Sequence, residues 1–112
     1  MTRAYVPDRG DLVWLTFDPQ AGREQQGRRP ALVLSPRIFN EKASLAVVCP
    51  VTSKVKGRMF EVLVSEGRIE GAILVNHLKS LDWQERRAQF AGKVDPATLE
   101  DVCERLRPLL GL

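Results

Sequence analysis

Short runs of β-forming residues, separated by proline, glycine and polar turn residues, recur along almost the whole chain and constrain its fold most strongly. The runs cover residues 11–17, 31–34, 45–49 with an extension to 52, 60–64, 72–75 and 87–94. Such runs are typical of antiparallel strands in a curled sheet, whose edges have to be closed or covered. Gly92, inside the last run, indicates a β-bulge. We therefore predict an α+β fold that is mainly β, with about five or six strands.

One helix is expected at the end of the chain. Asp95 is a suitable N-cap, and Pro96 fits the first helical position, where its missing N–H costs nothing. Pro108 is expected to end or kink this helix, because it lacks a donor and clashes one turn back. A shorter helical turn is expected at residues 37–42. The apolar residues that share one face of the main helix are Leu99, Val102, Cys103 and Leu106.

The length of 112 residues predicts a single domain that spans residues 1–112, and a hydrophobic fraction of 44% suffices for one core. No apolar run approaches the roughly 18 residues of a membrane helix, and the first residues contain no apolar signal segment. We therefore expect a cytoplasmic protein. Cys49 and Cys103 each lie in an apolar stretch, which favours buried, reduced thiols over a disulfide.

The segment between the first two runs, residues 18–30, is a long and polar connection for a hairpin, whose loops usually have about 2–5 residues. Two interpretations stay open: a solvated loop with incidental charge, or a loop that presents Glu24 together with arginines. Guanidinium groups match phosphate in two-point contacts. Arg29 directly precedes Pro30 at the entrance to an apolar strand, so its backbone should be extended and well ordered. Arg29 is therefore the more informative arginine.

Thr52 follows Pro50, which is expected to interrupt its strand and to mark an edge or a bulge. Bulges redirect side chains and recur near active sites. Without further information, an ordinary threonine at a strand end is the favoured interpretation of this residue.

The residues that the sequence lacks narrow the chemistry. A single histidine rules out a His–His acid/base pair within one chain, and no Cys, His and carboxylate cluster has metal-site spacing. Phosphate-loop and dinucleotide-binding glycine motifs are absent as well, so no cofactor is expected. The remaining groups, Arg, Glu and Thr, suit phosphoryl transfer by electrostatic stabilisation. The net charge of +3 is compatible with a polyanionic partner without demonstrating one.

Four segments resemble the MazF/PemK family of toxin ribonucleases. Residues 10–14 (GDLVW) resemble its opening strand, and residues 24–34 (EQQGRRPALVL) resemble its most diagnostic block. Residues 50–52 (PVT) resemble the block that supplies the family's threonine, and residues 76–80 (NHLKS) resemble a later polar segment. The similarity runs nearly end to end. The glutamate–arginine block together with a correctly placed threonine makes it specific.

This resemblance implies a small SH3-like (CcdB/PemK-like) barrel of about five to seven antiparallel strands with a C-terminal helix. It also implies a homodimer that cleaves single-stranded mRNA at a short recognition sequence without a metal, inhibiting translation and growth. The products would carry a 2′,3′-cyclic phosphate and a 5′-hydroxyl. A cognate antitoxin with an acidic, flexible tail would neutralise such a toxin.

The family motif also assigns roles to individual residues. It makes Arg29 the strongest catalytic candidate, as phosphate clamp and acid/base group, and makes Thr52 a hydrogen-bond partner of a phosphate oxygen. Glu24 would act as general base or orient the attacking group. Residues 76 and 77 depart from the family's acidic residue and glutamine, which leaves the recognised RNA sequence open. The expected RNA-binding residues are Phe17, Gln25, Arg28, Lys54, Lys56, Asn76, His77 and Lys79, with solvated surface as the alternative for the charged ones.

Two other functions remain to be distinguished. A toxin of the CcdB type, which binds gyrase on the same fold, would not need Arg29, Thr52 and Glu24 together. An SH3-like interaction module without activity would leave single-stranded RNA intact.

Overall fold

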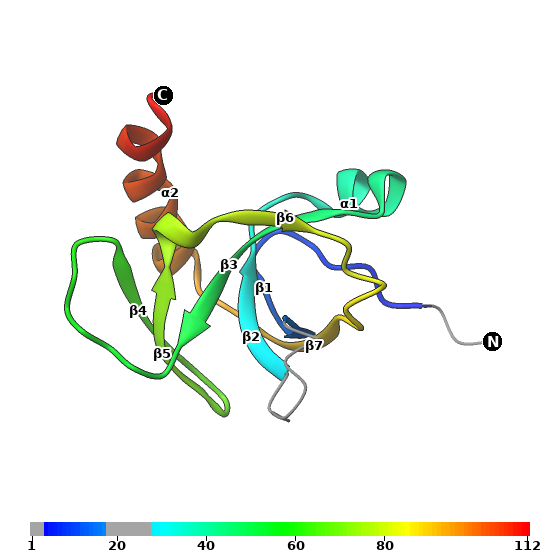
Figure 1. The fold of residues 1–112 in the computed structure, drawn as a ribbon, viewed down its shortest axis with the longest axis horizontal. Helices are drawn as coiled ribbons and strands as arrows, with labels where there is room; N and C mark the ends of the chain where they lie inside the picture. Colours follow the sequence, from blue (N-terminus) through cyan, green and yellow to red (C-terminus); the bar gives the residue numbers. More distant parts are fainter. Residues whose placement is uncertain (1–3, 18–27) are drawn as a thin grey trace.

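A computed structural model describes residues 4–17 and 28–112 of the chain. Its strands form a seven-stranded sheet in the order β4-β5-β3-β2-β1-β7, with β6 paired to β3, and each pairing between described strands is antiparallel (Figure 1). This confirms the predicted curled, mainly β sheet with a C-terminal helix. The elements are β1 (Asp11–Thr16), β2 (Arg28–Val33), α1 (Arg37–Ala43), β3 (Ala46–Thr52), β4 (Glu61–Glu66), β5 (Ile69–Leu74), the 3-10 helix η2 (Val75–His77), β6 (Lys79–Leu81), β7 (Gln89–Lys93) and α2 (Pro96–Leu110).

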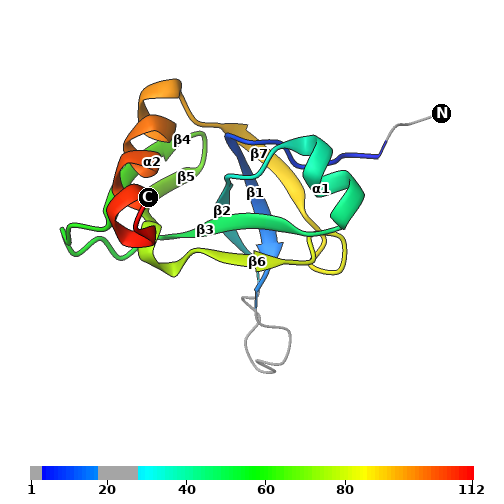
Figure 2. The same cartoon turned by 90° about the horizontal axis from the view of Figure 1, so that it is seen from above.

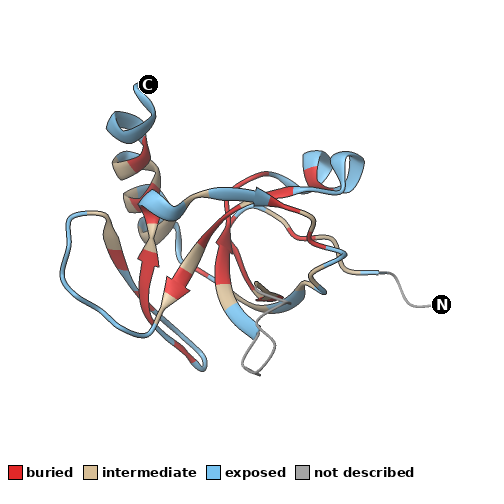
Figure 3. Cartoon of the chain, viewed as in Figure 1, coloured by how far each residue is buried: buried red, intermediate tan, exposed pale blue. Residues whose placement is uncertain are grey.

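Strands β1, β2 and β3 are buried on both faces, because alternate residues enter two different apolar clusters (Figure 3). Helix α2 closes the first, the α2-side cluster, which contains Leu12, Leu32 and Val51 together with Val102 of the helix. The α1-side cluster lies on the opposite face and contains Leu15 among its members. Figure 2 shows the two helices at opposite sides of these strands. The apolar runs in the sequence therefore reflect burial on two faces.

Pro50 does not interrupt its strand, so that prediction is wrong. Strand β3 continues through Pro50, which pairs with Ala31 of β2. On its other edge β3 changes partner around this residue, from β6 at Val48 to β5 at Val51. Because proline has no N–H to donate, the ladder on that edge of β3 is interrupted there. The segment that lies along this edge forms the 3-10 helix η2 at this point, between β5 and β6. The proline thus breaks the ladder on one edge and leaves the strand intact.

The ends of α2 follow from two residues. Asp95 caps the helix, with its carboxylate accepting a hydrogen bond from the Thr98 N–H at 2.8 Å, as predicted. That hydrogen bond also holds the pKa of Asp95 below its usual value. Pro108 was expected to end or kink the helix. It does not end the helix, since α2 continues to Leu110, so that part of the prediction is wrong. Gly111 ends α2 with φ +74°, so Pro108 lies inside the last turn, where its missing N–H removes one hydrogen bond of the helix.

The other local predictions have mixed outcomes. A bulge is confirmed in β7, because Leu12 pairs with Gly92 whereas Val13 pairs with Phe90. The helical turn at 37–42 is confirmed as α1, but β6 was not predicted. Both cysteines are free, with Cys49 buried and Cys103 half-buried. Burial raises the pKa of the Cys49 thiol to about 12.

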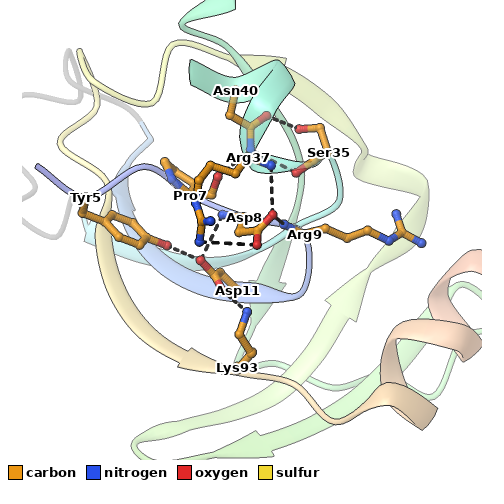
Figure 4. Close-up of polar contacts among 9 residues, drawn as sticks. All are labelled: Tyr5, Pro7, Asp8, Arg9, Asp11, Ser35, Arg37, Asn40 and Lys93. Atoms are coloured by element: carbon orange, nitrogen blue, oxygen red, sulfur yellow. Dashed lines mark hydrogen bonds and ion pairs between the residues drawn. The ribbon is translucent and has the colours of Figure 1, made fainter. Parts of the chain in front are cut away.

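A polar network fixes the start of β1 (Figure 4). The buried carboxylate of Asp11 accepts hydrogen bonds from the Tyr5 hydroxyl at 2.6 Å, the Asp8 N–H at 3.0 Å and the Lys93 ammonium group at 2.5 Å. Beside it, the fully buried Asn40 side chain donates to the carbonyl of Pro7 at 2.8 Å. These bonds tie the N-terminal segment to β1, β7 and α1 and satisfy the buried polar groups. No helix within residues 4–17 and 28–112 is long and apolar enough to cross a membrane.

Candidate active site

Arg29 and Thr52 lie on neighbouring strands, at the same end of the sheet (Figure 1). The β2–β3 ladder ends at the pair Ala31–Pro50, two residues before Arg29 and Thr52, and beyond it Val51 and Thr52 pair with β5. The pairing of the two strands therefore places the two strongest catalytic candidates at one end of the sheet, where both line the same cleft, although they are far apart in the sequence.

Strand alternation also fixes the face on which this pair lies. Arg29 pairs with Leu15 of β1, and Thr52 lies four residues beyond Val48 on β3. Leu15 and Val48 both belong to the α1-side cluster, so the side chains of Arg29 and Thr52 project on that side of the sheet. Arg29 is exposed and Thr52 half-buried, which leaves the guanidinium group accessible to a ligand.

A cleft of about 480 Å³ flanks the pair, where β2 begins and β3 ends. Trp14, Val51 and Ile69, which line part of it, pack with the α2-side cluster, so the cleft reaches the other face of the same strands. Arg68 and Glu70, from either side of the start of β5, also line it and were missed by the sequence analysis. They come close only through the β3–β5 pairing, for which the local sequence contains no signal.

The position of Thr52 depends on an unusually close approach of backbone from β5. An ideal Cβ on Gly71 would lie 2.0 Å from the Thr52 carbonyl oxygen, so a side chain there would clash with backbone. Only glycine allows this approach. The Thr52 hydroxyl accepts a hydrogen bond from the Lys54 N–H at 3.1 Å, and its own proton remains available for donation.

Arg28 projects from the opposite side of β2 to Arg29, because neighbouring residues in a strand alternate. Its guanidinium group donates to the Thr16 hydroxyl at 3.1 Å, the Arg86 carbonyl at 3.2 Å and the Gln89 side-chain oxygen at 3.2 Å. Arg28 thus joins β2 to the end of β1 and the start of β7. Its expected role in RNA binding stays a prediction, and its contacts give it a structural role as well.

Phe17 and Lys79, two of the expected RNA-binding residues, contact each other. The Lys79 ammonium group lies 5.3 Å from the centre of the Phe17 ring, a cation–π geometry. Phe17 packs at the margin of the α1-side cluster, the face that also carries Arg29 and Thr52. Asn76 and His77 lie close by in sequence, exposed on η2 just before β6. Phe17 and Lys79 therefore lie on the face of the candidate pair, whereas Asn76 and His77 belong to η2, whose Val75 packs in the α2-side cluster.

The remaining expected residues differ in position. Lys54 lines the cleft, while Lys56 lies further along the exposed β3–β4 connection. Glu24 and Gln25 lie outside the described residues. Within residues 4–17 and 28–112, no group of three or more His, Cys, Asp or Glu side chains is arranged to hold a metal ion.

The curled antiparallel sheet with a terminal helix places this protein in the class of small, SH3-like β-barrels that the resemblance implied. Arg29, Thr52 and Lys54 cluster where two of its strands end or begin. The model of the family described as "PemK-like, MazF-like toxin of type II toxin-antitoxin system" matches residues 8–110. Because this match covers most of the chain, the protein belongs to that toxin family.

Relatives and solved structures agree with this assignment. The chain is 41% identical to the endoribonuclease toxin MazF of Escherichia coli K12, over 99% of this chain and 100% of that protein. It is 35% identical to the endoribonuclease toxin ChpB of the same strain, over 92% of this chain and 93% of that one. A crystal structure of MazF from Deinococcus radiodurans matches with a TM-score of 0.87 and 49% identity, covering 97% of this chain and 100% of that chain. A MazE-MazF structure from the same organism matches with a TM-score of 0.87 and 44% identity, over 97% of this chain and 99% of that chain.

Proposed function

We propose that this chain, an endoribonuclease of the toxin family to which it belongs, cleaves single-stranded mRNA at a short recognition sequence without a metal ion. The observation that carries the proposal is the cleft that Arg29 and Thr52 line together, where β2 begins and β3 ends. An exposed guanidinium group beside a hydroxyl can bind two non-bridging oxygens of one phosphodiester. The curated relatives reported above, MazF and ChpB of E. coli, are named endoribonuclease toxins, which favours this function over the CcdB-type alternative.

The proposed reaction is an internal transesterification. The 2′-oxygen attacks the neighbouring phosphorus atom as its proton passes to a base, and the bond from phosphorus to the 5′-oxygen breaks as that oxygen gains a proton. A 2′,3′-cyclic phosphate and a 5′-hydroxyl result. Arg29 would neutralise the charge that develops on the phosphorane, and Thr52 would donate a hydrogen bond to a non-bridging oxygen. We assign proton removal to Glu24, with a role in orienting the 2′-hydroxyl as the alternative.

The surrounding residues suit binding of an unpaired strand. Lys54, Lys56 and Lys79 would contact phosphates, and Phe17 would stack on a base, as aromatic side chains do with single strands. Asn76 and His77 would contact base edges and thereby set the recognised sequence. We also assign Arg28 and Gln25 to the RNA-binding surface, with the bracing contacts of Arg28 described above as its second role.

We further propose that the toxin forms a homodimer and that a cognate antitoxin with an acidic, flexible tail neutralises it. The support is the family and the MazE-MazF structures of D. radiodurans. An acidic tail would find complementary charge on the basic side chains at the end of the sheet. Since mRNA is the proposed substrate, we expect the protein to act in the cytoplasm.

The decisive experiment sequences the 5′-hydroxyl ends that the purified protein generates in a mixed pool of single-stranded RNA, with a metal chelator present. We expect one consistent cut sequence. Arg29→Ala should lower the cleavage rate about a hundred- to a thousand-fold, the usual effect of removing one group that stabilises transition-state charge. Arg107→Ala, which removes an exposed arginine on α2, serves as the control and should cleave normally.

The possible outcomes separate the alternatives. Normal cleavage by a folded Arg29→Ala variant would remove Arg29 from the mechanism. Loss of wild-type activity upon addition of the chelator would contradict metal independence. Intact RNA combined with inhibition of DNA supercoiling by gyrase would support the CcdB-type alternative. Intact RNA without gyrase inhibition would support the third alternative, an SH3-like interaction module without activity.

A further inference from the structure

The connection between β3 and β4, residues 53–60, carries three cations and is called the basic segment here. Lys54, Lys56 and Arg58 are all exposed. An exposed connection of this length usually samples many conformations, and ordering it upon binding costs conformational entropy. The basic segment is nevertheless held by specific hydrogen bonds.

The carboxylate of Glu61, the first residue of β4, holds the middle of the basic segment. Its Oε1 atom accepts hydrogen bonds from three successive backbone N–H groups, those of Lys56 at 3.0 Å, Gly57 at 2.8 Å and Arg58 at 3.4 Å. Such a concave array of N–H groups is a nest, a backbone conformation that binds anions. Gly57 supplies the left-handed conformation, with φ +70°, on which the convergence of these groups depends. The nest is filled by a side chain of the same protein.

Two further contacts anchor the ends of the basic segment. At its start, the Lys54 N–H donates to the hydroxyl of Thr52 at 3.1 Å. At its end, Arg105 of α2 donates to the Met59 carbonyl oxygen. The segment is therefore fixed at both ends and in the middle, and its first lysine is tied directly to a member of the catalytic pair.

The Glu61 carboxyl group is ionised at neutral pH, which the nest requires. Desolvation raises its pKa, but the hydrogen bonds from the N–H groups of Lys56, Gly57 and Arg58 lower it, and the result lies below the usual value. A charged acceptor binds N–H groups more strongly than a neutral one does.

We propose that Glu61 is a positioning residue for RNA binding, which fixes the backbone of residues 56–58 and so presents Lys54 and Lys56 to the RNA phosphates. This inference rests on the proposed function. The change in RNA affinity that it predicts for removal of Glu61 has the opposite sign to the change that simple electrostatics predicts. Removing a carboxylate near a polyanion site should tighten binding if only charge matters. If Glu61 positions the lysines, its removal should weaken binding instead.

The experiment compares wild type, Glu61→Gln and Glu61→Ala with the control Glu66→Ala at the other end of β4. Each variant removes one negative charge, but Glu66 belongs to neither the nest nor the cleft. Affinity is measured on an RNA oligonucleotide that contains the cut sequence and a 2′-deoxy substitution at the cut site, between about 50 and 200 mM salt. Cleavage of the unmodified oligonucleotide gives kcat and KM separately.

We expect affinity to fall in the order wild type, Glu61→Gln, Glu61→Ala, with about a ten-fold loss for Glu61→Ala. Glutamine should rescue partly, because its amide oxygen still accepts hydrogen bonds. The slope of log affinity against log salt should become shallower by about 0.7 for each lysine–phosphate contact that is lost, and so by up to about 1.4 if Lys54 and Lys56 both lose theirs. The kcat of Glu61→Ala should stay within about two-fold of wild type, and Glu66→Ala should bind as wild type does.

Equal or tighter binding by both Glu61 variants would overturn the proposal. So would rapid hydrogen exchange at the amides of Gly57 and Lys56 in wild-type protein, a measurement that does not depend on any variant folding. If wild type neither binds nor cleaves RNA, the proposed function itself fails, and the exchange data still decide whether Glu61 orders the segment.

Discussion

Replacing Gly71 by alanine tests whether the close approach of β5 to β3 keeps Thr52 in place. The added Cβ would lie 2.0 Å from the Thr52 carbonyl oxygen, 2.9 Å from its carbonyl carbon and 3.1 Å from the Ser53 Cα. All three are backbone atoms, so no change of rotamer can relieve the contact. The strands have to separate by about 1.4 Å to bring the shortest distance to 3.4 Å, where ordinary contact begins.

The magnitude follows from what this separation disrupts. Crowding a well-packed site costs about 1–3 kcal/mol. The β3–β5 ladder consists of only two pairs, Val51 with Ile73 and Thr52 with Ala72, and each hydrogen bond lost costs about 1 kcal/mol net. The total is about 2–5 kcal/mol, which at about 4 °C per kcal/mol lowers the Tm by about 8–20 °C. Displacing Thr52 by about 1 Å should reduce cleavage about a hundred-fold in the molecules that remain folded.

Thermal unfolding and cleavage of an RNA oligonucleotide below the Tm measure the two effects separately. Gly92→Ala is the matched control, because its Cβ would meet only the flexible Glu66 side chain, at 3.1 Å, and the Tm should change by no more than a few degrees. A Gly71→Ala protein that melts within 2 °C of wild type, as an approximate margin, and cleaves normally would refute the reasoning. Thr52 would then not depend on the approach of β5.

Two further predictions concern titrating groups. The pKa values of Asp8 and Asp95 lie below their usual value, chiefly because backbone N–H groups, of Arg37 and Thr98 respectively, donate to these carboxylates. A lowered carboxyl pKa stabilises the fold above the unfolded-state pKa, and this stabilisation is lost as the pH falls through the folded-state pKa. The Tm should therefore fall at acid pH, and Asp95→Asn, which retains a capping oxygen, should show a smaller fall than wild type when melting is followed from neutral to acid pH. The Cys49 thiol, with its pKa raised to about 12 by burial, should resist iodoacetamide at pH 8 until the protein is denatured, and mass spectrometry showing rapid alkylation of the native protein would contradict this.

The parts of the fold that local sequence determines were predicted, and the parts that depend on distant pairing were not. The apolar runs and the capping residue Asp95 carry their own signals, so the long strands and the start of α2 were found. Strand β6 was missed because Lys79–Leu81 is short and mostly exposed, and it is a strand only because β3 has a free edge beside it. Pro50 was misjudged for a related reason, since its missing N–H matters on one edge of β3 only.

The candidate site shows the same division. The family pattern identified Arg29 and Thr52, but only the pairing of β2 with β3 explains why they line one cleft, and a register shift of one residue would turn one of them to the other face. Arg68 and Glu70 reach the cleft through the β3–β5 pairing, and Glu61 acts on a segment of backbone, so none of the three could be recognised as part of the site from residue type and spacing.

Arg28 and Arg29 illustrate why residue type alone does not assign a role. They are adjacent and chemically identical, yet strand alternation places their side chains on opposite faces of β2. On one face, Arg28 is held by Thr16, the Arg86 carbonyl and Gln89, and so braces the strand ends. On the other face, Arg29 shares the side of the sheet with Thr52. The bracing arginine keeps the strand in the register on which the position of Arg29 depends, so the pair combines support and proposed chemistry in two consecutive residues.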